Sequence, residues 1–111
     1  MSTVRLAHHK LRAYGAAVEL LLAVKGARVA DAGLREQAMR SAKSCCLNIA
    51  EAASRVSRAD KARVFGIARA EAAEACAAIE IAAISGDAVD PTPVLLAADA
   101  VVAMLTGLIR P

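Results

Sequence analysis

The sequence predicts an all-α fold: a single antiparallel four-helix bundle with up-down-up-down topology over residues 1–111. Three observations lead to this prediction. Alanine, the strongest helix former, supplies 29 of the 111 residues. Apolar side chains recur every three or four positions, which is the spacing of one helix face. Four such segments are separated by short stretches that carry glycine, proline or capping residues, and short connections place consecutive helices antiparallel.

The first two helices are predicted from their apolar rows and end signals. The first runs from about residue 3 to residue 25, before Gly26, because glycine is favoured just after a helix. Its apolar rows are Val4, Leu11, Val18 and Leu22, and Leu6, Ala13, Ala17, Leu20 and Val24. The second follows a capping residue, Asp31, and runs to about residue 55. Its inward row is Leu34, Ala38, Ala42, Cys45, Ile49 and Ala52.

The last two helices have equally clear start signals. Ser57, with Asp60 three positions later, predicts a capping box for a third helix that runs to about residue 85, before Gly86. Its inward row is Phe65, Ala68, Ala72, Cys76, Ile79 and Ala83. Asp90 and Pro91 open the fourth helix, which reaches Ile109 with a single charge, Asp99. A helix that is apolar nearly all round is buried on more than one side, so we expect it to contribute to a subunit interface. Residues 94–109 are fewer than a membrane span requires, and we expect no membrane association.

Charge is distributed unevenly along the chain. Residues 1–69 hold 13 of the 14 Lys and Arg and 5 of the 11 acids, whereas residues 70–111 hold one Arg and six acids. In an up-down bundle the start of the first helix, the turn between the second and third, and the end of the fourth share one end. That end gathers Arg5, His8, His9, Lys10, Arg12, Arg55, Arg58, Lys61, Arg63 and Arg110. We take seven of these as candidates for contacting nucleic-acid phosphates: Arg5, Lys10, Arg12, Arg55, Arg58, Lys61 and Arg63. With only Tyr14 and Phe65 as aromatic residues, both expected to face inward, binding should be electrostatic and weakly selective.

A regular polar row marks residues 34–55. Six polar side chains recur there every three or four positions: Gln37, Arg40, Ser44, Asn48, Glu51 and Arg55. We interpret this row, called the polar ladder below, mainly as a structural network that sets helix register. The expected partners are Glu74 for Arg40, and Lys61 or Arg63 for Glu51. Asn48 should bond to a neighbouring helix or subunit.

The sequence offers little for catalysis or metal binding. Cys45, Cys46 and Cys76 form no CxxC motif, and two adjacent histidines in a helix point about 100° apart. Glu71, Glu74 and Glu80 lack a supporting His or nucleophilic Ser. We therefore expect no enzyme activity, no catalytic residue, no cofactor and no metal. An odd number of cysteines without a signal peptide indicates a cytoplasmic protein with reduced thiols.

Two segments resemble the signatures of a known family. The segment NIAEA at residues 48–52, with Gln37, Arg40, Ser44 and Arg55 around it, is similar to the first signature of small bacterial four-helix bundle proteins, which include proteins encoded in 23S rRNA intervening sequences. The segment FGIARAEAAEA at residues 65–75 resembles the second, with Glu74 as its acidic residue. Ala52 replaces the glycine of the first signature, Glu71 replaces a serine usual in the second, and the loop at residues 29–33 lacks the common proline.

The resemblance implies a homo-oligomer, specifically a pentamer. Distant relatives are accessory proteins of diversity-generating retroelements, which resemble basic barrels that bind RNA and a reverse transcriptase. Two functions stay open on these grounds. One is a noncatalytic homo-oligomer whose basic end binds RNA or DNA. The other is a protein adapter or scaffold that docks an enzyme partner, such as a reverse transcriptase, without nucleic acid.

Overall fold

The computed structural model describes residues 5–111, which form four long helices and no strand. The helices are α1 (Arg12–Gly26), α2 (Ala32–Ser54), α3 (Arg58–Ile84) and α4 (Thr92–Ile109). A short 3₁₀ segment, η1 (Ala7–Lys10), precedes α1. The predicted all-α fold with four helices is confirmed.

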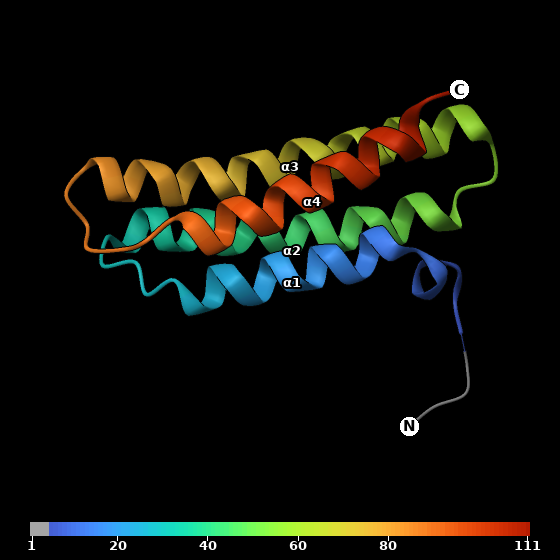
Figure 1. Ribbon diagram of the computed structural model, residues 1–111. Helices are drawn as coiled ribbons and strands as arrows, with labels where there is room; N and C mark the ends of the chain where they lie inside the picture. The colour runs from blue at the N-terminus through green and yellow to red at the C-terminus, as the bar shows by residue number, and fades with distance from the viewer. Residues whose placement is uncertain (1–4) are drawn as a thin grey trace.

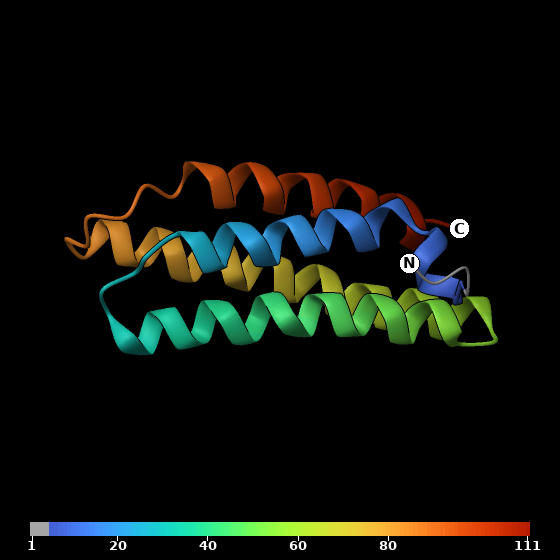
Figure 2. The ribbon, with the colours of Figure 1, turned by 90° about the horizontal axis from the view of Figure 1, so that it is seen from below.

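The helices lie side by side in an elongated body about 45 × 34 × 20 Å. Figures 1 and 2 show the chain reversing direction at each of its three connections. The most extensive contact joins α2 to α3, and α3–α4, α4–α1 and α1–α2 are the other neighbouring pairs. Within residues 5–111, α2 and α4 do not touch, so they lie diagonally across the bundle. Their outer faces therefore point to opposite sides of the molecule.

The predicted first helix is wrong over its initial turns. The helix begins at Arg12, because Leu11 adopts an extended conformation (φ −90°, ψ 125°) that turns the chain and lets η1 pack against α2. His9 Nδ1 accepts a hydrogen bond from the Leu6 amide at 2.9 Å and so caps this separate segment. In the first predicted apolar row, Leu11 and Val18 are half-buried against the core, but Leu22 is exposed. The second row is buried from Ala13 onward. The predicted residues 3 and 4 lie outside the described part of the chain.

The starts of α2 and α3 follow their predicted caps, and α4 starts at the predicted Asp90–Pro91 signal, with Pro91 at its N-cap position. Asp31 Oδ1 accepts from the Leu34 amide at 2.9 Å, and Ser57 Oγ accepts from the Asp60 amide at 3.1 Å. The Asp60 carboxylate does not complete the predicted capping box, because it pairs with two arginines instead. Asp90 Oδ1 accepts from the Thr92 amide at 3.0 Å. This bond lowers the pKa of Asp90, since it favours the ionised carboxylate.

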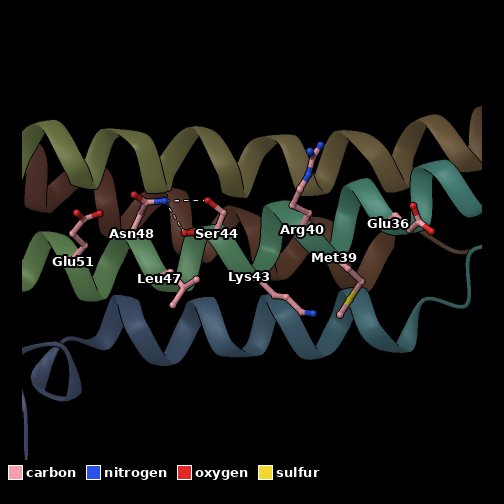
Figure 3. A pocket seen from close by; sticks show the side chains of 8 residues that line it. All are labelled: Glu36, Met39, Arg40, Lys43, Ser44, Leu47, Asn48 and Glu51. Carbon is pink, nitrogen blue, oxygen red and sulfur yellow. Dashed lines mark hydrogen bonds between the residues drawn. The ribbon is translucent and has the colours of Figure 1, made fainter.

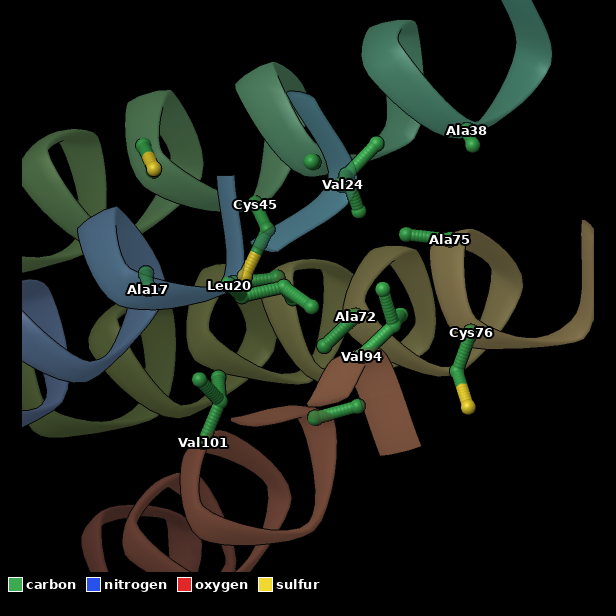
Figure 4. Close-up of a cluster of buried hydrophobic side chains, with 14 of the residues drawn as sticks. Ala17, Leu20, Val24, Ala38, Cys45, Ala72, Ala75, Cys76, Val94 and Val101 are labelled. Atoms are coloured by element: carbon green, nitrogen blue, oxygen red, sulfur yellow. The ribbon is translucent and has the colours of Figure 1, made fainter. Parts of the chain in front are cut away.

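The core is built mostly from small side chains (Figure 4). The inward rows predicted for α2 and α3 are buried except for Leu34 and Ala83, which are half-buried. The largest side chains that are fully enclosed are Leu20, Ile49, Ile79 and Leu105. Because alanines surround these few large residues, helices must approach closely to exclude water.

The fourth helix is strongly apolar but weakly buried. Its 18 residues have a mean hydropathy of 1.9, and only 22% of them are buried in the bundle. By length and composition alone α4 would be able to cross a membrane, whereas the apolar segment predicted from the sequence, residues 94–109, is shorter than a span. Leu95 and Leu96 project from it with 47% and 67% of their surface exposed. A large part of this helix therefore lacks a partner within one chain.

Asp87 joins the two connections at one end of the bundle. Its Oδ2 atom accepts hydrogen bonds from the Ala30 amide at 2.8 Å and the Asp31 amide at 3.2 Å. These donors belong to the α1–α2 connection, whereas Asp87 follows α3. The carboxylate therefore ties segments more than 50 residues apart.

Replacing Asp87 with Ala should lower the free energy of unfolding by about 1–2 kcal/mol, because both backbone donors lose a charged acceptor at a partly solvated site. Thermal or urea unfolding measures this loss. Asp87→Asn, which keeps one acceptor oxygen without the charge, should fall between the wild type and the Ala variant. Equal midpoints for all three proteins would contradict the assignment.

Candidate nucleic-acid interface

One end of the bundle collects most of the candidate cations. The segment η1, the α2–α3 connection and the C-terminus lie at this end in both views (Figures 1 and 2). We define the basic end by the cationic residues that these segments carry: Arg5, Lys10, Arg12, Arg55, Arg58, Lys61, Arg63 and Arg110. Arg5 is exposed and precedes η1. The segments that the sequence reading brought to one end are thus together at that end.

Two of the cations that we predict to contact phosphates, Arg55 and Arg63, are already paired with carboxylates. Arg55 pairs with Glu51 at 2.6 Å and with Asp60 at 3.3 Å, and Arg63 pairs with Asp60 at 2.9 Å. The hydrogen bond that Arg55 donates to the Glu51 carboxylate raises the pKa of Arg55. Glu51 was expected to meet Lys61 or Arg63 and instead bonds within α2, because residues four apart on a helix are direct neighbours. Arg55 and Arg63 are therefore poorly suited to bind phosphate.

The remaining cations have no carboxylate within 4.0 Å in the part of the chain that the structure describes. Lys61 Nζ donates to the Ala53 carbonyl at 2.9 Å, which ties α3 to the end of α2. Arg58 donates to the Arg110 carbonyl at 2.7 Å, which ties α3 to the C-terminal residues. Lysine has three donors and arginine five, so both side chains keep donors for another ligand. Lys10 and Arg12 are exposed beside them.

Two open hollows lie among these free cations. The first hollow, about 250 Å³, is lined by Ala7, Leu11, Ala53, Arg58, Lys61, Phe65 and Leu108. The second hollow, about 330 Å³, is lined by Lys10, Leu11, Arg12, Ala13, Met104 and Leu108. Leu11 and Leu108 belong to both, so the hollows are adjacent. Their linings come from segments far apart in the sequence, and no local pattern in the sequence could have predicted them.

The two histidines pack against an aromatic ring beside this end. The ring centroid of His8 lies 4.2 Å from that of His9 and 4.7 Å from that of Tyr14. Both aromatic residues are predicted to face inward. Tyr14 is only half-buried, whereas Phe65 is buried as expected. Among the described residues no group of three or more His, Cys, Asp or Glu side chains is placed to hold a metal ion.

The polar ladder forms bonds mainly along α2, with one bond across to α3. Gln37 Nε2 donates to Glu74 Oε1 at 2.7 Å, and Gln37 Oε1 accepts from Arg40. The direct Arg40–Glu74 pair predicted from the sequence is absent among residues 5–111, because Gln37 lies between the two charges. Asn48 Nδ2 donates to the Ser44 carbonyl at 2.9 Å and to Ser44 Oγ at 3.0 Å (Figure 3). The predicted bond from Asn48 to a neighbouring helix does not form within one chain.

Replacing Gln37 with Leu should lower the free energy of unfolding by about 0.5–1.5 kcal/mol, because the side-chain bond from the ladder to α3 is lost. Gln37→Glu should cost more, since it places a second carboxylate beside Glu74. Chemical denaturation at low and high salt separates the two effects, because screening should recover part of the loss for Glu only. A Leu variant as stable as the wild type would exclude a structural role for this bond.

The outer face of α2 is an open depression without a partner in the chain. Figure 3 shows its side chains, all from α2, with Leu47 and Lys43 pointing toward α1 and Arg40 pointing away. Ser44 and Asn48 are half-buried, and Leu47 is 70% exposed. Glu36 and Glu51 lie toward the two ends of the depression. A face with apolar side chains such as Leu47 and Met39 and with charges toward its ends suits packing against another polypeptide surface.

All three thiols are buried and unpaired. Burial raises the pKa of Cys45 to about 12 and also raises that of Cys46. Burial, followed by the nearby Glu80 carboxylate, raises the pKa of Cys76 to about 11. These cysteines are therefore poor nucleophiles near neutral pH, because the thiolate is the reactive form.

Iodoacetamide should label none of the three cysteines appreciably in the native protein near pH 7.5, and all of them after denaturation; mass spectrometry of labelled peptides measures this. Because folding favours the neutral thiols, their contribution to stability is complete below pH 9, which is the ordinary pKa of a thiol. It falls as the pH rises through the raised pKa values of about 11 for Cys76 and about 12 for Cys45. Rapid native labelling of any one thiol would contradict its placement.

The chain matches the family model of the 23S rRNA-intervening sequence proteins over residues 9–105. It belongs to this family. The match extends from η1 almost to the end of α4, so it includes most of the basic end and the whole polar ladder. No curated protein matches the chain.

Proposed function

We propose that this family member is a noncatalytic, cytoplasmic homo-oligomer, an antiparallel up-down-up-down bundle whose basic end binds RNA or DNA through phosphates. The single observation that carries the nucleic-acid role is the group of cations without carboxylate partners that line the two hollows: Lys10, Arg12, Arg58 and Lys61. Clustered cations that lack carboxylate partners bind polyanions by releasing condensed counterions. The three unpaired cysteines suit a reducing compartment.

Unpartnered apolar surface supports self-association. The fourth helix is apolar and mostly unburied, and α2 presents an open face on the opposite side of the bundle. A contact in which the α4 face of one copy packs on the α2 face of the next is heterologous, and such contacts generate rings or filaments. The resemblance noted from the sequence favours a closed ring of five subunits. A ring would also repeat the basic end, so weak sites could act together on one nucleic acid.

The test is a titration of fluorescently labelled RNA and DNA oligonucleotides with the purified protein at several salt concentrations. We expect log K to fall linearly with log salt, with a slope near −0.7 for each phosphate contacted on a single strand. Native mass spectrometry of the same sample should give oligomers with a single subunit number. Binding that is absent even at low salt would overturn the nucleic-acid role, and a monomer at micromolar concentration would overturn self-association.

The exposed apolar residues of α4 also favour a second candidate, a protein adapter that docks an enzyme such as a reverse transcriptase. Leu95 and Leu96 could pack on such a partner as readily as on another copy. Affinity purification from the native host, with and without nuclease, separates the two functions. A protein partner that stays bound after nuclease treatment supports the adapter function. A partner that is released by nuclease treatment supports the nucleic-acid role.

A further inference from the structure

We infer that the two hollows of the basic end receive unpaired nucleobases, so that the protein selects single-stranded over double-stranded nucleic acid. This inference rests on the proposed nucleic-acid role and adds a ligand class to it. It revises the sequence-based expectation of weakly selective binding, which followed from the inward placement of Phe65. Phe65 is indeed buried, with 5% of its surface exposed, but it lines the first hollow.

The chemistry of the first hollow matches one nucleotide. Its walls are aliphatic or aromatic carbon from Leu11, Phe65 and Leu108, and flat apolar base faces pack well on such surfaces. Its polar groups are the cations of Arg58 and Lys61, which only donate hydrogen bonds. A ligand must therefore present an apolar body together with anionic or acceptor atoms. A nucleotide has both, in its base and its phosphate.

The second hollow repeats this pattern next to the first. Lys10 and Arg12 supply its charge, and Met104 adds another apolar wall. Because Leu11 and Leu108 separate the two hollows, neighbouring bases of one strand could occupy them. The cations then lie on both sides of the shared wall, where phosphates of the same strand would pass.

The shape of the site disfavours duplexes. Bases in a double helix are stacked and paired, so an apolar hollow on a protein surface reaches them only after they are extruded, which costs free energy. An unpaired strand presents its bases without that cost. Free cations alone would bind both forms, so the apolar walls are the feature that discriminates.

The experiment compares three oligonucleotides of equal length with the full-length protein: an oligo-dT strand, an abasic strand with the same phosphates, and a duplex. We expect fluorescence anisotropy to give about tenfold tighter binding of oligo-dT than of either other probe, because only its unpaired bases can bury apolar surface against the leucine walls of the hollows. Leu108→Ser removes the shared wall without changing charge. It should remove most of this preference while leaving binding of the abasic strand and the salt slope unchanged.

Leu22→Ser is the matched control, since it removes an exposed leucine of α1 that lines neither hollow. Equal affinities for the three probes would overturn the base-binding inference and leave the proposed phosphate binding intact, as would a Leu108→Ser variant that keeps the full preference. No binding of any probe at low salt would instead refute the proposed nucleic-acid role itself. Tighter binding to anionic lipid vesicles, with no competition from oligo-dT, would assign the hollows to a lipid and refute the inference.

Discussion

The double variant Lys10→Ala, Arg12→Ala should bind a single-stranded oligonucleotide at least about tenfold more weakly than the wild type near physiological salt, because two phosphate contacts are lost. Both residues edge the second hollow, and neither forms an ion pair in the described chain. The slope of log K against log salt should become shallower by about 1.4, since each single-strand phosphate contact contributes about 0.7. Fluorescence anisotropy at four or more salt concentrations measures both quantities.

The control for this variant removes two charges elsewhere. Lys25, in the last turn of α1, and Arg28, in the α1–α2 connection, are exposed cations away from both hollows. Lys25→Ala, Arg28→Ala should keep nearly the wild-type affinity and slope. If the two double variants weaken binding equally, affinity follows net charge, and the basic end is not a defined site.

Replacing Ile49 with Ala should lower the free energy of unfolding by about 2–5 kcal/mol, one of the largest effects expected for a single substitution in this chain. Ile49 is fully buried in α2 and is one of few large side chains in the core. The loss combines the transfer of the deleted carbon atoms with the cavity that they leave. Alanine side chains nearby are too short to move into that space, so we expect the cavity to remain.

Ile84→Ala is the matched control, because it is the same substitution at the end of α3, where 84% of the side chain is exposed. It should change stability by less than about 0.5 kcal/mol. Urea unfolding at a single protein concentration should be used for both variants, since the stability of an oligomer depends on concentration. Similar midpoints for the two variants would contradict the assignment of Ile49 to the core.

Local signals in the sequence predicted most helix boundaries well. Asp31 and Ser57 each cap the helix expected, because a cap needs only residues a few positions apart. The start of the first helix was wrong for the opposite reason. The packing of η1 against α2, which turns the chain at Leu11, is a contact between distant segments that helix propensity cannot reveal.

The candidate site could be predicted only in part. Topology and charge correctly brought the cations of η1, α3 and the C-terminus to one end. Which cations are free depended on side-chain geometry: Asp60 reaches both Arg55 and Arg63, and Gln37 comes between Arg40 and Glu74. A shift of one helical turn between two packed helices changes which side chains pair. The spacing of apolar residues in the sequence does not resolve a shift of that size.

The amino-acid sequence by itself determined the all-α class, the four helices, the inward rows of α2 and α3 and the uneven charge, because each follows from composition or from spacings within one segment. Only the tertiary structure decided the two hollows, the Asp87 bridge between connections and the division of the cations into paired and free. These features depend on distances between side chains from segments far apart in the sequence. Such distances are set by how closely the alanine-rich helices pack, and no single segment of the chain specifies them.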